Sequence, residues 1–225
     1  MAVVFDTSAS GIATGSTNLD LDVSLTVGTG DDMIIVGKCG TYSGSGTITS
    51  VTYDPTGTAD AFTKFVEAFN GTKSSYQWYL LDGPIIHSAA RVVRFSSAVG
   101  ARKVGIPSSW TTVDQTTPLE DGLTDTGTGT AAGTAGSSGA GEPVVDFLMK
   151  SGTSIITINA GQTLINNESE RAAASYEFAS DGTGMTWVSI EDFAYTSARI
   201  KEAAAGGPVD LPYQPWQARG PILAQ

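Results

Sequence analysis

The side chains best suited to acid–base or nucleophilic chemistry are few in this chain. Its one histidine, His87, follows a proline turn in PIIHSAARV, and its one cysteine, Cys39, lies in the apolar stretch MIIVGKCG. A serine or cysteine hydrolase needs a base beside its nucleophile. The chain has no GxSxG motif, and no spacing brings Cys39 near His87. We therefore expect His87 at the surface or a strand edge, Cys39 in the core, and no enzymatic activity.

Carboxylates are numerous, and a pair of them could hydrolyse a glycosidic bond if their separation were right. The sequence does not fix that separation, so none is assigned a catalytic role. The candidates are Glu142, Asp146, Glu168, Glu170, Glu177, Glu191 and Asp192. Metal-binding motifs such as HExxH or an EF-hand loop are absent, and a single cysteine excludes a multi-cysteine zinc site. We expect no metal and no cofactor.

Composition and charge narrow the possible partners. Of the 225 residues, 23 are acidic and 12 basic, which gives a formal net charge of −11, so binding to a nucleic-acid backbone would oppose the overall field. No apolar run approaches the length of a membrane span, and the first residues lack a signal-peptide pattern. We expect synthesis in the cytoplasm without a signal peptide and no contact with nucleic acid or membrane.

The sequence predicts that short strands position these residues. In LDLDVSLTV (19–27) apolar residues alternate with polar ones, which indicates a strand with one buried face. Asp20 and Asp22 then share the other face. They could form a catalytic pair or a calcium site, but a solvated face is the favoured interpretation. Further strands are expected at 33–39, 47–53, 61–69, 75–81, 90–96, 102–106, 143–150, 153–159, 172–178, 185–190 and 191–203.

This rhythm of short strands and turns predicts an all-β protein, an antiparallel β-sandwich or jelly roll of roughly a dozen strands. Residues 61–69 could pass for a helical turn, but Asn70-Gly71 favours a hairpin. In YQWY (76–79) the aromatic side chains could stack on a sugar. Because Tyr76 and Trp78 fall on one strand face, packing inside the sandwich is favoured instead.

Two segments break the strand pattern. The Gly/Thr-rich stretch 121–142 has nothing to fill a core and is expected to be a loop, or a weak strand with a flexible crossover. Residues 204–225 carry four prolines, so they suit neither a helix interior nor a central strand. We expect one sandwich domain at 1–203 followed by an extended C-terminal arm at 204–225. The arm's candidate partner-binding residues are Leu211, Tyr213, Trp216, Ile222 and Leu223.

Several segments together resemble a known family. VDQTTPLE (113–120) is similar to the VDQTTPL signature of a β-sandwich module found in tailed-bacteriophage virion proteins and prophage proteins. Further segments that resemble the module stand before and after this signature, in the family's order. They are ATGSTNL (13–19), ITSVTY (48–53), WYLL (78–81), GEPVVDF (141–147), AGQT (160–163), AAASYEF (172–178) and MTW (185–187). The chain departs from the pattern in DPTGTADAF (54–62) and at Phe193-Ala194, so the surface used for partners can differ.

The resemblance implies a structural, non-catalytic role in a bacteriophage virion. The expected function is a head decoration or cement protein, or a head–tail-associated protein. It would bind neighbouring capsid, tail or portal-associated subunits through its sandwich surface and the arm, after synthesis in the host cytoplasm. A homo-oligomer is expected as well. The alternative is a carbohydrate-binding or adhesive module of a tail fibre or surface protein, which would need exposed aromatic side chains.

Overall fold

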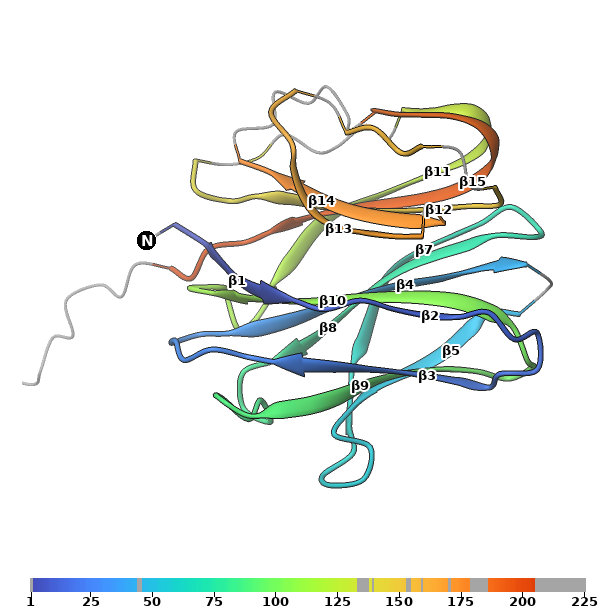
Figure 1. Ribbon diagram of the computed structural model, residues 1–225. Coiled ribbons are helices and arrows are strands. Elements are labelled where there is room, and N and C mark those ends of the chain that lie inside the picture. Colours follow the sequence, from blue (N-terminus) through green and yellow to red (C-terminus); the bar gives the residue numbers. More distant parts are fainter. Residues whose placement is uncertain are drawn as a thin grey trace, which may run out of the picture.

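The computed structural model describes residues 2–43, 46–132, 138, 140–152, 155–158, 160–169, 171–178 and 186–204. Within these ranges the chain forms fifteen strands and no helix, and every strand pairing is antiparallel. The strands make three sheets stacked as layers (Figure 1). The predicted all-β sandwich is confirmed, with a third sheet in addition to the two of a simple sandwich.

The middle sheet is built around β4 (Ile34–Ser43), which pairs with β10 on one side and β8 on the other. This confirms the expectation that the apolar stretch 33–39 is a central strand. The sheet runs in the order β1 (Val4–Ser8), β10 (Arg102–Thr111), β4, β8 (Ser74–Leu81) and β7 (Thr63–Phe69), and β2 (Gly11–Ala13) also pairs with β10.

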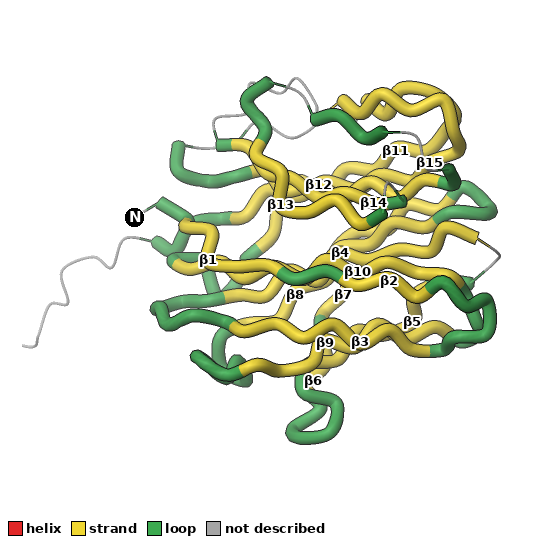
Figure 2. The backbone as a smooth tube through the Cα atoms, in the orientation of Figure 1, coloured by secondary structure: helices red, strands yellow, loops and turns green. Residues whose placement is uncertain are grey.

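Two outer sheets cover the two faces of the middle sheet (Figures 1 and 2). One runs in the order β11 (Leu119–Ala132), β15 (Thr186–Ile200), β12 (Val144–Lys150), β14 (Ala172–Glu177) and β13 (Thr163–Glu168). The other runs β3 (Asp20–Thr26), β9 (Ala90–Ser97), β5 (Ile48–Tyr53) and β6 (Asp60–Ala61). We call them the β12 sheet and the β3 sheet.

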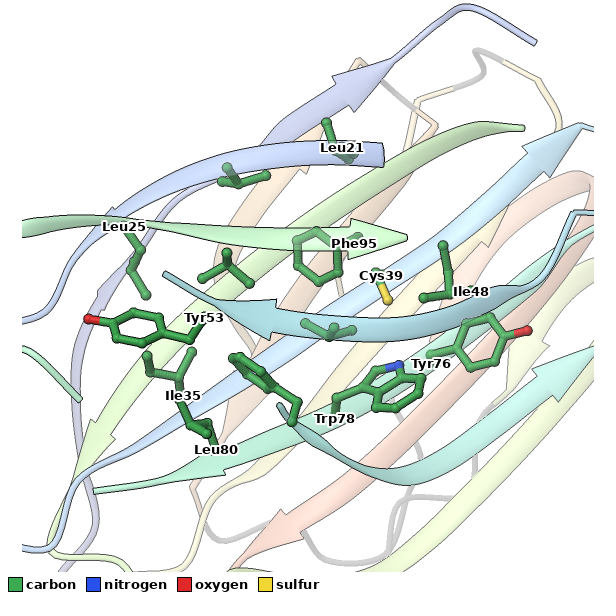
Figure 3. Packing of buried hydrophobic residues seen from close by; sticks show 14 of the residues in the cluster. Leu21, Leu25, Ile35, Cys39, Ile48, Tyr53, Tyr76, Trp78, Leu80 and Phe95 are labelled. Carbon is green, nitrogen blue, oxygen red and sulfur yellow. The ribbon is translucent and has the colours of Figure 1, made fainter. Parts of the chain in front are cut away.

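The core between the β3 sheet and the middle sheet follows the sequence pattern closely. Alternate residues of β3 are buried, and the aromatic rings of β5, β8 and β9 pack with them (Figure 3). Cys39 is fully buried among these side chains, as expected. Tyr76 and Trp78 share this core, with ring centroids 6.4 Å apart. The packing interpretation of YQWY is therefore confirmed for these two residues.

The opposite face of β3 is polar and solvated, as expected. Asp22 accepts two hydrogen bonds of 2.7 Å from the guanidinium of Arg94 on β9, and these bonds lower the pKa of Asp22. Asp20 accepts a 2.6 Å bond from the hydroxyl of Ser96. The two carboxylates thus serve as cross-strand partners on an exposed sheet face.

Strand β10 continues five residues past the expected 102–106, through a proline. In an antiparallel ladder the N–H and C=O of one residue point to the same neighbour. The carbonyl of Pro107 accepts from the N–H of Ala9 at 3.1 Å, in the gap between β1 and β2. The missing N–H therefore faces a point where the neighbouring strand is already interrupted, and a central strand tolerates the proline.

Of the two expectations for residues 121–142, a loop or a weak strand with a flexible crossover, residues 121–132 follow the second and lie in a strand. β11 occupies residues 119–132 and pairs with β15 along its length, with a bulge at Gly129, whose φ is +108°. Gly122 lies against Phe65 of β7, where an added Cβ would come within 2.9 Å of the ring. The Gly/Thr composition gives only a weak strand signal, because this strand is stabilised by strand pairing and close packing rather than by an apolar pattern of its own.

The expected strand at 153–159 is wrong for its described part, 155–158, which has no regular structure. Ile156 and Ile158 instead pack on the outer face of the β12 sheet, against buried Leu148, Phe193 and Tyr195. Strands β1, β2 and β13 were not expected from the sequence. The two strands expected at 185–190 and 191–203 form one long strand, β15.

The core between the middle sheet and the β12 sheet is divided into two apolar clusters. One includes Ile34, Val36, Trp110, Val145 and Ala198. The other includes Val104, Ile106, Phe147, Met149 and Ala174. Polar side chains of the middle sheet lie along the same strand faces between them, so this core is not apolar throughout.

Hydrogen bonds cross directly between these two sheets. The amide nitrogen of Gln77 donates to the carbonyls of Val145 and Thr196, at 3.3 and 3.1 Å. The hydroxyl of Ser75 donates to the carbonyl of Phe147 at 3.0 Å. Because these bonds are buried and directional, they fix how one sheet lies on the other, which apolar packing alone specifies less sharply.

A lysine is also buried between these sheets. Lys38 of β4 has no exposed surface, and its ammonium group donates to the hydroxyl of Ser108. That hydroxyl also accepts a 2.9 Å bond from the indole N–H of Trp110. Burial lowers the pKa of Lys38 to about 7, and the charge of Asp146 partly opposes this shift. A buried amine of this kind makes stability depend on pH.

Candidate functional site

The VDQTTPL segment (Val113–Leu119) joins β10 to β11 at the end of the sheets that also holds the N-terminus (Figure 1). Val113 and Leu119 are buried in the core that β15 shares with the middle sheet. The polar residues between them turn the chain from the middle sheet into the β12 sheet. This segment is therefore the junction of two layers.

Asp114 shapes the turn. Its Oδ1 accepts from the backbone N–H groups of Thr116 and Thr117, at 2.7 and 3.0 Å. These two bonds are the main reason that the pKa of Asp114 is lowered. An aspartate that binds the backbone two and three residues ahead initiates a turn, and Pro118 then fits a chain that has already changed direction.

Gln115 ties three parts of the chain together. Its amide nitrogen donates to the carbonyls of Met33 and Val113, both at 3.1 Å, and its carbonyl oxygen accepts from the N–H of Asp82 at 3.1 Å. Met33 precedes β4 and Asp82 follows β8, so one side chain bridges two loops next to the junction. A glutamine can make this contact because it carries both donors and an acceptor.

The same segment holds the end of β15. The N–H of Asp114 donates to the carbonyl of Lys201, and the N–H of Lys201 donates to the carbonyl of Pro118, both at 3.0 Å. The N–H of Ala203 donates to the carbonyl of Thr112 at 2.9 Å. The chain is therefore fixed through Ala203, directly before the predicted arm.

Charged side chains surround this junction. Arg199 lies 2.6 Å from Glu120, 3.1 Å from Asp121 and 3.4 Å from Glu142. Lys201 pairs with Glu120 at 3.0 Å, and this bond lowers the pKa of Glu120. The acids around the junction are thus taken up by internal ion pairs, which suits a structural anchor better than a catalytic site.

The five residues predicted to bind a partner, Leu211, Tyr213, Trp216, Ile222 and Leu223, lie outside the described residues. The last described residue, Ala204, follows Ala203, whose N–H donates to the carbonyl of Thr112 directly before the VDQTTPL segment. The sequence indicates this segment but not the contacts of Gln115, because its partners lie 33 and 82 residues away in the chain.

His87 is partly exposed near the surface, as expected. Its Nδ1 donates to the carbonyl of Gly28 at 2.9 Å, and its Nε2 lies 3.3 Å from a carboxylate oxygen of Asp82. Cys39 is buried in the core on β4, and no contact joins it to His87. The structure therefore does not bring the imidazole of His87 and the thiol of Cys39 together.

The candidate acids are distributed over several places. Each of four has a different local partner: Glu142 contacts Arg199, Asp146 accepts from Ser175, Glu168 accepts from Ser10, and Glu191 contacts Lys150. Glu170 lies outside the described residues. In the described ranges no three His, Cys, Asp or Glu side chains are grouped so that they could hold a metal ion. Nor is any helix there long and apolar enough to cross a membrane.

Comparison with known proteins gives no relative. No protein-family model matches the chain, and no curated protein or solved structure is significantly similar to it. The resemblance of the VDQTTPL segment to a phage module therefore stays a prediction from the sequence.

Proposed function

We propose that this chain is a structural protein of a bacteriophage virion, a head decoration or cement protein or a head–tail-associated protein. Its sandwich surface and the arm would bind neighbouring virion subunits. The observation that carries the proposal is the VDQTTPL segment. The residues that resemble the phage module's signature are those that join two sheets and hold the chain up to Ala203.

Two further features support a structural role. The side chains of Asp114 and Gln115 in the VDQTTPL segment are used in internal bonds, so they stabilise the domain rather than present a reactive surface. The three sheets share two cores, which gives a rigid body from which an arm can extend. A rigid domain with an extended, proline-rich segment is a common way to bind a neighbouring subunit at low entropic cost.

A truncation tests the role of the arm. A chain that stops after Gly207 is expected to keep the unfolding midpoint of the full chain but to lose binding to particles that lack their own copy of the protein. Co-sedimentation with such particles measures binding, and thermal unfolding measures stability. A truncated chain that binds as well as the full chain would contradict a partner-binding arm. A large loss of stability in isolation would show that the arm clasps its own domain.

The expected carbohydrate-binding alternative has less support. Tyr76 and Trp78, two of its candidate aromatic residues, are buried in the core (Figure 3). Saturable binding on a glycan array, lost on substitution of exposed aromatic side chains, would favour that alternative over the virion role.

A further inference from the structure

Two arginines of this acidic protein have no acidic partner among the described residues. Among the described arginines, Arg91, Arg94 and Arg199 form ion pairs with carboxylates. Arg102 and Arg171 form none within the part of the chain that the structure describes, although acids outnumber bases 23 to 12. In a chain with so many more acids than bases, a guanidinium group without a carboxylate partner among the described residues is unexpected. These two arginines also line the same hollow.

Arg102 and Arg171 line one open hollow of about 410 Å³, which we call the arginine hollow. Its other lining residues are Ile12, Thr14, Tyr42 and Ser169. Tyr42 belongs to the end of β4 and Arg102 to the start of β10, so the hollow lies opposite the end of β10 that leads into the VDQTTPL segment. The hollow is thus formed between the middle sheet and the β13–β14 turn, away from the junction.

Arg171 is held in place from two sides. Its guanidinium carbon lies 5.2 Å from the ring centroid of Tyr42, a side chain that is only 5% exposed. One of its guanidinium nitrogens donates to the carbonyl of Ser151. Its backbone N–H donates to the carbonyl of Glu168 at 3.0 Å. An arginine fixed by stacking and hydrogen bonds loses little freedom when it binds a ligand.

The two charged side chains that line the hollow, Arg102 and Arg171, are both positive. Burial raises the pKa of Tyr42, and the charges of Arg171 and Arg102 both oppose that shift, so both guanidinium groups act on the same phenol. Burial lowers the pKa of Lys73; the charge of Asp192 opposes this shift and the charge of Arg171 adds to it. The neighbouring carboxylate of Glu168 already accepts bonds from the hydroxyls of Ser10 and Ser169, at 2.7 and 3.2 Å.

We propose that the arginine hollow binds a phosphate-type oxyanion, held by Arg102 and Arg171. Guanidinium groups match the oxygens of phosphate in geometry and charge. A phosphate dianion has enough oxygens to accept from both arginines and from the hydroxyl of Thr14, whereas a carboxylate has only two oxygens. The bound group would also relieve the repulsion between two unpaired cations. The site is independent of the proposed virion role, because binding is a property of the isolated chain.

Titration of the isolated full-length chain tests the proposal. Inorganic phosphate and glycerol 3-phosphate, added at low salt and followed by amide NMR shifts, are expected to bind saturably, with shifts around residues 12–14, 42, 102 and 169–171. The phosphomonoester tests whether the hollow accepts a phosphate that belongs to a larger molecule. Tighter binding of glycerol 3-phosphate identifies such a source, and tighter binding of phosphate identifies the free ion.

Substitutions separate this site from general charge effects. Arg102→Gln and Arg171→Gln are each expected to weaken phosphate binding at least tenfold. Arg102 is exposed and makes no side-chain bond among the described residues, so its substitution is expected to leave the fold intact. Arg91→Gln, which removes an arginine already paired with Asp54, is the matched control and should leave binding unchanged. Absence of saturable binding, an equal loss in the control, or acetate binding more tightly than phosphate would overturn the proposal.

Discussion

Replacement of Lys38 by methionine is expected to stabilise the protein at pH 7 by roughly 2–4 kcal/mol. The native amine is buried and its pKa is lowered to about 7, from 10.5 in the unfolded chain. At pH 7 and below the amine must be buried with much of its charge, which disfavours the folded state. Methionine has a similar length, and Ser108 keeps its bond from Trp110.

The pH dependence of the free energy of unfolding tests this account more specifically than its value at pH 7. Between pH 7 and 10 the unfolded wild-type chain binds a proton at Lys38 that the folded chain does not. The wild-type free energy of unfolding should therefore rise with pH by up to about 1.4 kcal/mol per unit from this group. The stability gained in Lys38→Met should be largest near pH 7 and shrink towards pH 10. Other titrating groups are common to both proteins and cancel in the difference.

Urea denaturation of both proteins at several pH values measures this difference. Lys64→Met is the control, because Lys64 is half exposed and its substitution should change stability by less than about 0.5 kcal/mol at every pH. A difference between wild type and Lys38→Met that does not change with pH would contradict the account of a buried amine with a lowered pKa.

Replacement of Gln115 by glutamate is expected to destabilise the protein by about 2–4 kcal/mol at pH 7. The change leaves the acceptor that receives the Asp82 N–H but places a carboxylate oxygen against the carbonyls of Met33 and Val113. Below about pH 4 the introduced carboxyl group is protonated and can donate one bond. Part of the stability lost relative to Gln115→Ala should then return.

Thr116→Ala is the matched control for the VDQTTPL segment. In the part of the chain that the structure describes, Thr116 makes a hydrogen bond through its backbone N–H and none through its side chain, so this change should cost less than about 0.5 kcal/mol. Chemical denaturation at pH 7 and pH 4 measures all three variants. Wild-type stability of Gln115→Glu at pH 7 would contradict the role of Gln115 as a bridge between the two loops.

The sequence predicts those strands whose residues show an apolar or alternating pattern within the strand itself. The alternation in 19–27 and the apolar run in 33–39 are visible locally, and both strands form as expected. For β11 the sequence does not decide between a loop and a weak strand, because Gly and Thr residues carry no apolar alternation and the strand is ordered by its pairing with β15. In 155–158 the isoleucines cover a sheet face rather than join a sheet, and both arrangements require the same residue types.

The two features to which a role is proposed here, the Gln115 bridge and the arginine hollow, depend on contacts between residues far apart in the sequence. The bridge made by Gln115 joins loops that precede β4 and follow β8. The arginine hollow brings together Arg102, at the start of β10, and Arg171, in the turn before β14. Neither arrangement follows a period in the sequence, so neither could be predicted from it. The role of the arm stays a prediction, since residues 205–225 lie outside the described residues.

The most direct test of the virion role is the copy number of this chain in purified phage particles. Quantitative mass spectrometry of particles from the host that encodes the chain measures the ratio of this chain to the major capsid protein. A head decoration protein predicts many copies, in a fixed ratio to capsid subunits, and a head–tail-associated protein predicts a small fixed number at the joint. Absence of the chain from purified particles that retain their other structural proteins would contradict the proposed function.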